Sequence, residues 1–226
     1  LTVLSGPLAT MKLPELRADT DQPVEADILL RGGTLYDGSG ADGRLGDVAI
    51  AGERIVAVGQ FETGRVERTI DCRGLIVAPG FIDAHSHCDR EILTPKRRGN
   101  LNRLIEGCTT VVTGNCGGGK LDTDKFHAQL DEHGAGTNVV HLIPQGNVRD
   151  AVMGHDDRRP TPDELDRMRR MIDEGMRAGA WGMSTGLIYV PSVYADTDEL
   201  VELAKVVASH GGIYASHIRG EEDQLL

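Results

Sequence analysis

The chain has 226 residues, 39% of them hydrophobic, which is enough to bury a sizeable core. Its 35 acidic and 24 basic residues give a formal net charge of −11 at pH 7, and this argues against nucleic acid as a partner because phosphate binding needs a positive face. No stretch approaches the roughly 20 apolar residues that cross a bilayer, and four cysteines are too few for a secreted disulfide scaffold. We therefore expect a globular, cytoplasmic protein that binds neither nucleic acid nor a membrane.

The N-terminal third of the chain changes in composition at Ala26, from a polar segment to short apolar runs. Residues 1–25 form a polar leader with three prolines, for which we expect no regular structure. Short apolar runs separated by Gly-rich and Asp-rich turns then follow, namely Ile28–Leu30, Val48–Ile50 and Ile55–Val58. This pattern predicts a small β domain over residues 26–78, of the β-sandwich kind.

From Pro79 onward, strands alternate with helices. Strands are predicted at Phe81–Asp83, Thr109–Thr113, Val139–Ile143, Ala180–Thr185 and Gly212–Ser216. Thr161 is expected to cap one helix, with proline next and Glu164 closing a capping box, and a second helix is predicted to begin near Asp196 or Thr197. This alternation predicts a parallel sheet over residues 79–226, either open or closed into a barrel. A dinucleotide-binding open sheet is disfavoured because no glycine fingerprint follows an early strand.

A pair of histidines follows the first of these strands. Side chains two residues apart in an extended segment point to the same side, so His85 and His87 are expected to lie side by side. An isolated His-x-His is more often an ordinary pair of surface or core histidines. Its place at the end of an apolar strand favours a metal site here.

Two further residues follow strand ends in the same way. Cys116 lies in a glycine-rich loop after the second strand, and His217 follows the fifth. A lone cysteine is most often a small buried hydrophobe, but a thiolate beside imidazoles is a natural zinc ligand. The carboxyl ends of barrel strands open onto one face, so we expect these residues to gather with His85 and His87 into a metal site. The remaining cysteines and histidines are expected to be structural or solvated.

These motifs resemble the amidohydrolase superfamily and, within it, the N-acyl-D-amino-acid deacylase family. The resemblance covers about residues 26–226 and is carried by the segments 78–87, 107–117, 182–189, 194–200 and 216–219. It implies a TIM-like (β/α)8 barrel of the amidohydrolase type, flanked by the small β domain. Residues 81–226 number 146, against roughly 250 in a full barrel, so we expect a barrel truncated after about its fifth strand.

The resemblance also implies a chemistry. Zn²⁺ would be held tightly by Cys116 and His217 and more weakly at a second position by His85 and His87, with the cysteine able to bridge. Tyr189 would contact the substrate. The expected reaction is hydrolysis of the amide bond of a small N-acyl-D-amino acid to a carboxylate and a free D-amino acid. The general acid and base would be an aspartate beyond residue 226, so no catalytic residue is assigned here and the chain alone is expected to be inactive.

Two alternative functions stay open at this stage. A cyclic amidohydrolase of the hydantoinase or dihydroorotase type shares the paired histidines, but it needs a carboxylated lysine on strand four and residues 182–187 contain none. A non-catalytic half-barrel would use Cys116 and His217 only for packing or for incidental metal. Gln145 stands where many relatives are expected to carry histidine, and Cys88 where an acidic residue is frequent, so the resemblance does not define the fine substrate preference. An unclosed sheet also predicts a poorly stable or aggregating chain, without a sharp thermal transition as a soluble monomer.

Overall fold

The computed structural model describes residues 22–221 and divides the chain into two compact units between Pro79 and Gly80. The predicted polar leader lies outside the described residues up to residue 21, but its last part is wrong, because a strand already begins at Val24. No helix in the described part of the chain is long and apolar enough to span a membrane.

The N-terminal unit is built on a five-stranded sheet. Its strands are β1 (Val24–Leu35), β2 (Arg44–Ala51), β3 (Arg54–Gly59), β4 (Thr63–Asp71) and β5 (Ile76–Val77), in the order β3-β2-β1-β4 with β5 also paired to β1. Strand β1 runs antiparallel to β2 and parallel to β4 and β5. Ala26, Leu29, Ala49 and Ala57 form its buried cluster. The described residues of this unit form one sheet, so a sandwich remains a prediction.

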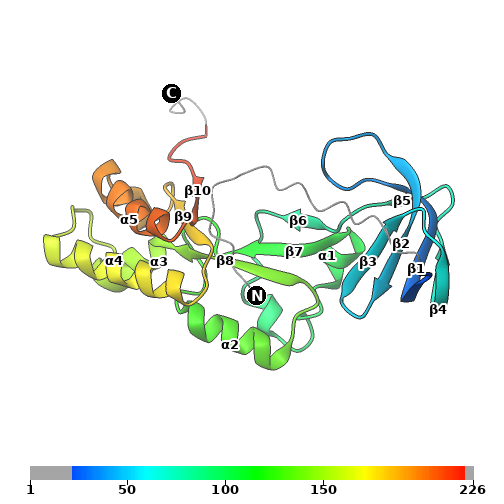
Figure 1. The fold of residues 1–226 in the computed structure, drawn as a ribbon. Coiled ribbons are helices and arrows are strands. Elements are labelled where there is room, and N and C mark those ends of the chain that lie inside the picture. Colours follow the sequence, from blue (N-terminus) through cyan, green and yellow to red (C-terminus); the bar gives the residue numbers. More distant parts are fainter. Residues whose placement is uncertain (1–21, 222–226) are drawn as a thin grey trace. The chain divides into compact units, whose positions relative to one another are not determined.

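The second unit contains a curved, wholly parallel sheet in the order β10-β9-β8-β7-β6 (Figure 1). Its strands are β6 (Phe81–Asp83), β7 (Cys108–Thr113), β8 (Asn138–Pro144), β9 (Gly182–Gly186) and β10 (Ile213–His217). All five predicted strands are present, with their ends shifted by at most two residues. The longer helices that alternate with them are α2 (Thr123–His133), α3 (Gln145–Met153), α4 (Pro162–Arg177) and α5 (Thr197–Ser209). The short elements are η1 (Glu91–Leu93), α1 (Leu101–Ile105) and η2 (Ser192–Tyr194).

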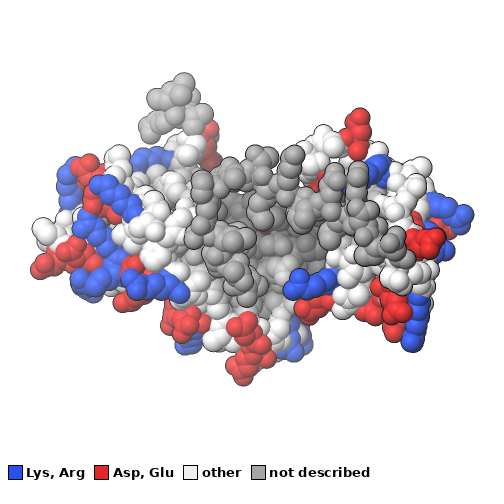
Figure 2. Space-filling model, viewed as in Figure 1, with Lys and Arg blue, Asp and Glu red and all other residues white. Residues whose placement is uncertain are grey.

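The core of the second unit lies between the sheet and α3, α4 and α5. Ile143 and Met183 from the sheet are fully buried, as are Met168, Ile172 and Leu203 from the helices. Burying each such side chain contributes roughly 1.5–3 kcal/mol, so this cluster fixes the helices against the strands and holds the carboxyl ends of β8 and β9 in place. On the face drawn in Figure 2, acidic and basic side chains lie interspersed over α4 and α5.

The start of α4 predicts a pH effect. Thr161 and Glu164 form the expected capping box, and both carboxylate oxygens of Glu164 accept hydrogen bonds from Arg158. The Arg158 hydrogen bonds, followed by the one from the Thr161 amide, lower the Glu164 pKa from its usual 4.5 to about 2. A depressed carboxyl pKa stabilises the fold above the unfolded-state pKa, and this stability is lost as pH falls through the folded-state value.

We therefore expect Glu164→Gln to lower the urea midpoint of unfolding at pH 7. The difference from wild type should shrink between about pH 4.5 and about pH 2, where the wild-type carboxyl gains its proton. Urea titrations of both proteins at a series of pH values measure this. A difference that does not change with pH would show that the Arg158 contact contributes no pH-dependent stability.

The two outer strands of the parallel sheet expose apolar side chains. Phe81 and Ile82 on β6 are 63% and 66% exposed, and Ile213 on β10 is 52% exposed. Among the described residues neither strand has a neighbour on its outer side. Unpaired apolar edges favour strand-to-strand association. We expect Ile82→Lys to slow the aggregation of the chain in light-scattering measurements, whereas Leu45→Lys, at an exposed residue of the inner strand β2, should leave the rate unchanged.

Candidate metal centre

Cys116 sits in a tight turn directly after β7. Its backbone is left-handed, with φ of +55°, and Gly114 and Gly117 on either side have φ of +75° and +68°. Asn115 is buried, and its side-chain amide donates a hydrogen bond of 2.8 Å to the Val112 carbonyl. A non-glycine residue with positive φ is uncommon and persists where its surroundings hold it, which is frequent at functional sites.

Glycines let neighbouring strands press closely on this turn. A Cβ atom on Gly114 would lie 2.0 Å from the Leu142 carbonyl oxygen, and one on Gly186 would lie 2.1 Å from that of Cys116. The Ser184 hydroxyl accepts a hydrogen bond of 3.0 Å from the Gly117 amide. Strands β8 and β9 therefore fix the position of the cysteine.

The two histidines after β6 reach the same place. The backbone amide of Ser86 donates to Val112 of β7, and the Ser86 side chain is buried, so the rings of His85 and His87 lie on the opposite, exposed side. His85 Nε2 is 3.3 Å from Cys116 Sγ. The candidate ligand atoms of His85, His87 and Cys116 all lie within 4.8 Å of one another.

His217 approaches the same sulfur from the far edge of the sheet. It is the last residue of β10, and its Nδ1 lies 3.5 Å from Cys116 Sγ. Its Nε2 lies 3.1 Å from a carboxylate oxygen of Glu221, and its ring is 5.1 Å from that of Tyr189. The structure thus brings all four predicted metal residues and Tyr189 together, with His217 just outside the compact group of three.

The donor atoms of this cluster suit a metal of the zinc type. Sulfur and imidazole nitrogen are the ligands that Zn²⁺ prefers, whereas Mg²⁺ and Ca²⁺ select oxygen. Burial, and secondarily the charge of Glu221, raises the pKa of the Cys116 thiol. A cation bound beside the sulfur would favour the thiolate form. Among residues 22–221, no other group of three or more His, Cys, Asp or Glu side chains meets the geometry for a metal.

A cavity of about 320 Å³ adjoins the cluster. His87, Cys116 and Tyr189 line it, together with Pro191 and Ser192 from the loop after β9. A larger cavity of about 530 Å³ shares only His87 with it and is lined otherwise by residues 86–103. The smaller cavity contains the sulfur and the tyrosine, so it is the better candidate for the substrate site.

Glycine at position 186 is expected to be essential for the metal centre. Alanine there would push directly on the Cys116 carbonyl and move the sulfur away from the imidazoles. We expect Gly186→Ala to weaken zinc binding at least about tenfold, measured by competition with a chelator, since small displacements of supporting groups cost that much. Gly118→Ala in the same turn is the matched control, because nothing lies within 4 Å of its added Cβ. Equal affinities in the two variants would contradict this account of the turn.

The structure places other residues named from the sequence away from the cluster. Gln145 is fully buried at the start of α3, where its side chain contacts Glu199 and Ser192, so it does not reach the cavity as a substrate contact. Cys72, Cys88 and Cys108 are free and outside the group. His141 is buried and hydrogen-bonded to Thr113 and to the Lys120 carbonyl. The sequence interpretation missed Glu221, although its spacing of four residues from His217 was a usable signal.

Comparison with known proteins identifies the family of this chain. Residues 68–212, more than half of it, match the amidohydrolase family. The chain belongs to this family. It is 37% identical to D-aminoacylase of Alcaligenes xylosoxydans xylosoxydans over 223 residues, with 88% of this chain and 46% of that protein covered. It is 38% identical to N-acyl-D-aspartate deacylase of the same organism over 230 residues, with 91% and 46% covered. The resemblance inferred from the motifs is confirmed.

Solved structures of amidohydrolases agree with this placement. N-acyl-D-glutamate deacylase of Bordetella bronchiseptica, complexed with zinc and a phosphonate inhibitor, superposes with a TM-score of 0.82 at 34% identity, covering 88% of this chain and 46% of that one. D-aminoacylase gives 0.81 at 35% identity, covering 87% and 46%. L-hydantoinase of Arthrobacter aurescens, at 0.58 and 17% identity, shows the fold alone. The curved parallel sheet thus corresponds to part of the TIM-type barrel of these relatives, and the chain spans about half the length of the relatives it matches.

Proposed function

We propose that this chain forms the metal-binding part of a zinc-dependent N-acyl-D-amino-acid deacylase, which hydrolyses the amide bond to a carboxylate and a free D-amino acid. The observation that carries the proposal is the meeting of Cys116 with His85, His87 and His217 beside a cavity. It is supported by the deacylase relatives and by the zinc in one of them. All four cysteines are free, which fits the reducing cytoplasm as its compartment.

Each residue of the site would have a separate role. Cys116 and His217 would hold the main zinc ion and His85 and His87 a second, weaker position. When bound, zinc would polarise the acyl carbonyl and lower the pKa of water. Nε2 of His217 lies beside the carboxylate of Glu221, and its Nδ1 faces the sulfur of Cys116. Tyr189, which lines the same cavity, would orient the substrate.

Chiral chromatography of N-acetyl-DL-methionine tests the proposal. The assay uses the longest natural protein that contains these 226 residues, loaded with zinc, and its Cys116→Ala variant. Release of D-methionine alone, lost in the variant, is the expected result. Release of the L form, or hydrolysis of a hydantoin in place of the acyl amino acid, would overturn the substrate assignment. Zinc bound without hydrolysis of either compound would favour the non-catalytic alternative.

A further inference from the structure

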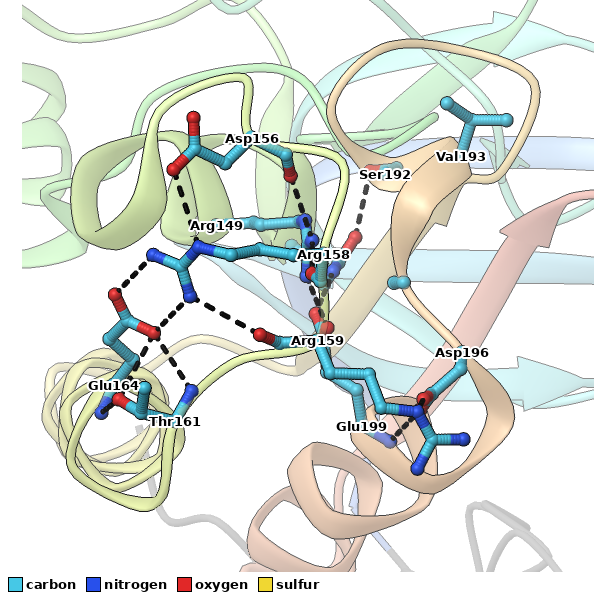
Figure 3. Close-up of polar contacts among 12 residues, drawn as sticks. Arg149, Asp156, Arg158, Arg159, Thr161, Glu164, Ser192, Val193, Asp196 and Glu199 are labelled. Carbon is cyan, nitrogen blue, oxygen red and sulfur yellow. Dashed lines mark hydrogen bonds and ion pairs between the residues drawn. The ribbon is translucent and has the colours of Figure 1, made fainter.

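Four polar side chains from α3, η2 and α5 form a buried network of contacts (Figure 3). Arg149 and Gln145 of α3 are fully buried, and Glu199 of α5 and Ser192 are each 2% exposed. Glu199 forms an ion pair with Arg149 through one carboxylate oxygen and accepts a hydrogen bond of 3.0 Å from Gln145 through the other. Ser192 donates a hydrogen bond of 2.7 Å to Oε1 of the Gln145 side-chain amide.

Arg149, at the other end of this network, is also held by backbone carbonyl groups. Its second terminal nitrogen donates to the carbonyl oxygens of Asp156 and Arg158, at 3.3 Å and 2.7 Å, in the segment between α3 and α4. The guanidinium is therefore held by a carboxylate and two backbone groups. Fully buried ions are costly unless their partners are fixed in this way, so the ion pair constrains where Glu199 and Gln145 can lie.

Ser192, at one end of this buried network, forms part of the cavity wall. Ser192 lines the cavity with Tyr189 and Pro191, and the Val193 amide donates to the Tyr189 carbonyl at 2.8 Å. A shift of Ser192 would therefore move Tyr189. The Ser192 hydroxyl also packs tightly between Gly117 and Gly146, since Cβ atoms there would lie 3.1 Å and 2.8 Å from it.

The same loop is held from its other side by Arg219. This residue follows β10 and donates to the carbonyl oxygens of Val193 and Ala195, the first at 2.7 Å. The loop from Tyr189 to Ala195 is thus fixed between Ser192, which is attached to the buried side chains, and Arg219, which lies next to the strand carrying His217. Few arrangements of the loop satisfy both attachments.

We infer that Arg149, Glu199, Gln145 and Ser192 act together as a positioning device that sets the Tyr189–Ser192 wall of the cavity against Cys116. None of the three inner residues lines the cavity, and they act through Ser192. The consequence for substrate binding rests on the function proposed above. If Tyr189 contacts the substrate in both the ground state and the transition state, loosening the wall weakens binding without slowing the chemical step, so KM rises while kcat changes little.

The position of the wall can be measured without any reaction. Protein labelled with 3-fluorotyrosine gives ¹⁹F resonances for its four tyrosines, and Tyr189→Phe assigns the one of interest. Gln145→Met and Ser192→Ala each remove the contact between Ser192 and Gln145. We expect both to shift or broaden the Tyr189 resonance and to leave that of Tyr36, in the N-terminal unit, unchanged. Ser209→Ala, an exposed hydroxyl at the end of α5, is the matched control. An unmoved Tyr189 resonance would overturn the inference.

Kinetics of the longest natural protein then test the consequence for binding. We expect Gln145→Met and Ser192→Ala to raise KM for N-acetyl-D-methionine about fivefold or more, with kcat within about twofold and zinc content unchanged. Equal losses in kcat and zinc content would indicate a general structural role and overturn the positioning role. Wild-type protein without deacylase activity would refute the proposed function, while the ¹⁹F experiment would still decide whether these residues position the wall.

Discussion

Replacing Cys116 with alanine is expected to lower the affinity of the chain for zinc by at least about 100-fold, because the substitution removes a direct thiolate ligand and even supporting groups cost 10–100-fold. The sulfur lies 3.3 Å from His85 Nε2 and 3.5 Å from His217 Nδ1, so both proposed metal positions depend on it. Without it, the imidazoles of His85, His87 and His217 lose their common partner.

Isothermal titration against a competing chelator measures this loss. Cys108→Ala is the matched control, since Cys108 is a free cysteine at the opposite end of β7 and outside the cluster. We expect Cys108→Ala to bind zinc like wild type. If the Cys116→Ala variant retained wild-type affinity, the metal centre proposed here would be wrong.

The stoichiometry of the same titration addresses the bridging role. If Cys116 contacts both metal positions, its removal weakens every binding step. His85→Ala should weaken only the second, weaker step and leave the first one intact. A Cys116→Ala variant that loses one step and keeps the other at full affinity would show that the cysteine belongs to a single position.

The gathering of the metal residues could be predicted because it depends on topology. The carboxyl ends of parallel strands lie at one edge of the sheet, so residues at or just after the ends of β6, β7 and β10 meet although they are up to 132 positions apart in the chain, as His85 and His217 are. The left-handed backbone of Cys116 was indicated only indirectly by its flanking glycines. The close approach of neighbouring backbone at Gly114 and at Gly186 of β9 could not be read from the glycine-rich loop alone.

Elements without a local signal were harder to predict. Strand β4 is rich in charge and has no fully buried residue; it forms because β1 pairs with it along most of its length. Helix α3 begins directly after β8, and no side chain caps its N-terminus. In both cases tertiary contacts, which single-sequence patterns do not contain, decide the local structure.

Glu199 shows the same limit at the level of one side chain. It follows the N-cap Asp196 by three residues in an acidic first turn, a pattern typical of an exposed capping residue. Its backbone amide does donate to Asp196, but its carboxylate is buried against Arg149, 50 positions earlier in the chain. Only the fold brings the two charges together, and no local sequence pattern links them.

Removing one charge of this pair is expected to destabilise the second unit strongly. Glu199→Ala leaves the guanidinium of Arg149 buried and without its carboxylate, which costs about 3–5 kcal/mol of unfolding free energy. Urea denaturation followed by circular dichroism measures this. Asp173→Ala is the control, because it removes a partly exposed carboxylate that pairs with Arg177 on α4 and with His210 after α5, and it should change stability far less.

The double variant Arg149→Met/Glu199→Met separates stability from positioning. Replacing both charges by apolar side chains removes the unpaired ion, so we expect the double variant to be more stable than Glu199→Ala and close to wild type. Gln145 would still lose its acceptor on Glu199, and the Tyr189 resonance should remain shifted. A double variant with restored stability but a displaced wall would show that the ion pair fixes the cavity rather than the fold; one as unstable as Glu199→Ala would show that the pair is required for folding.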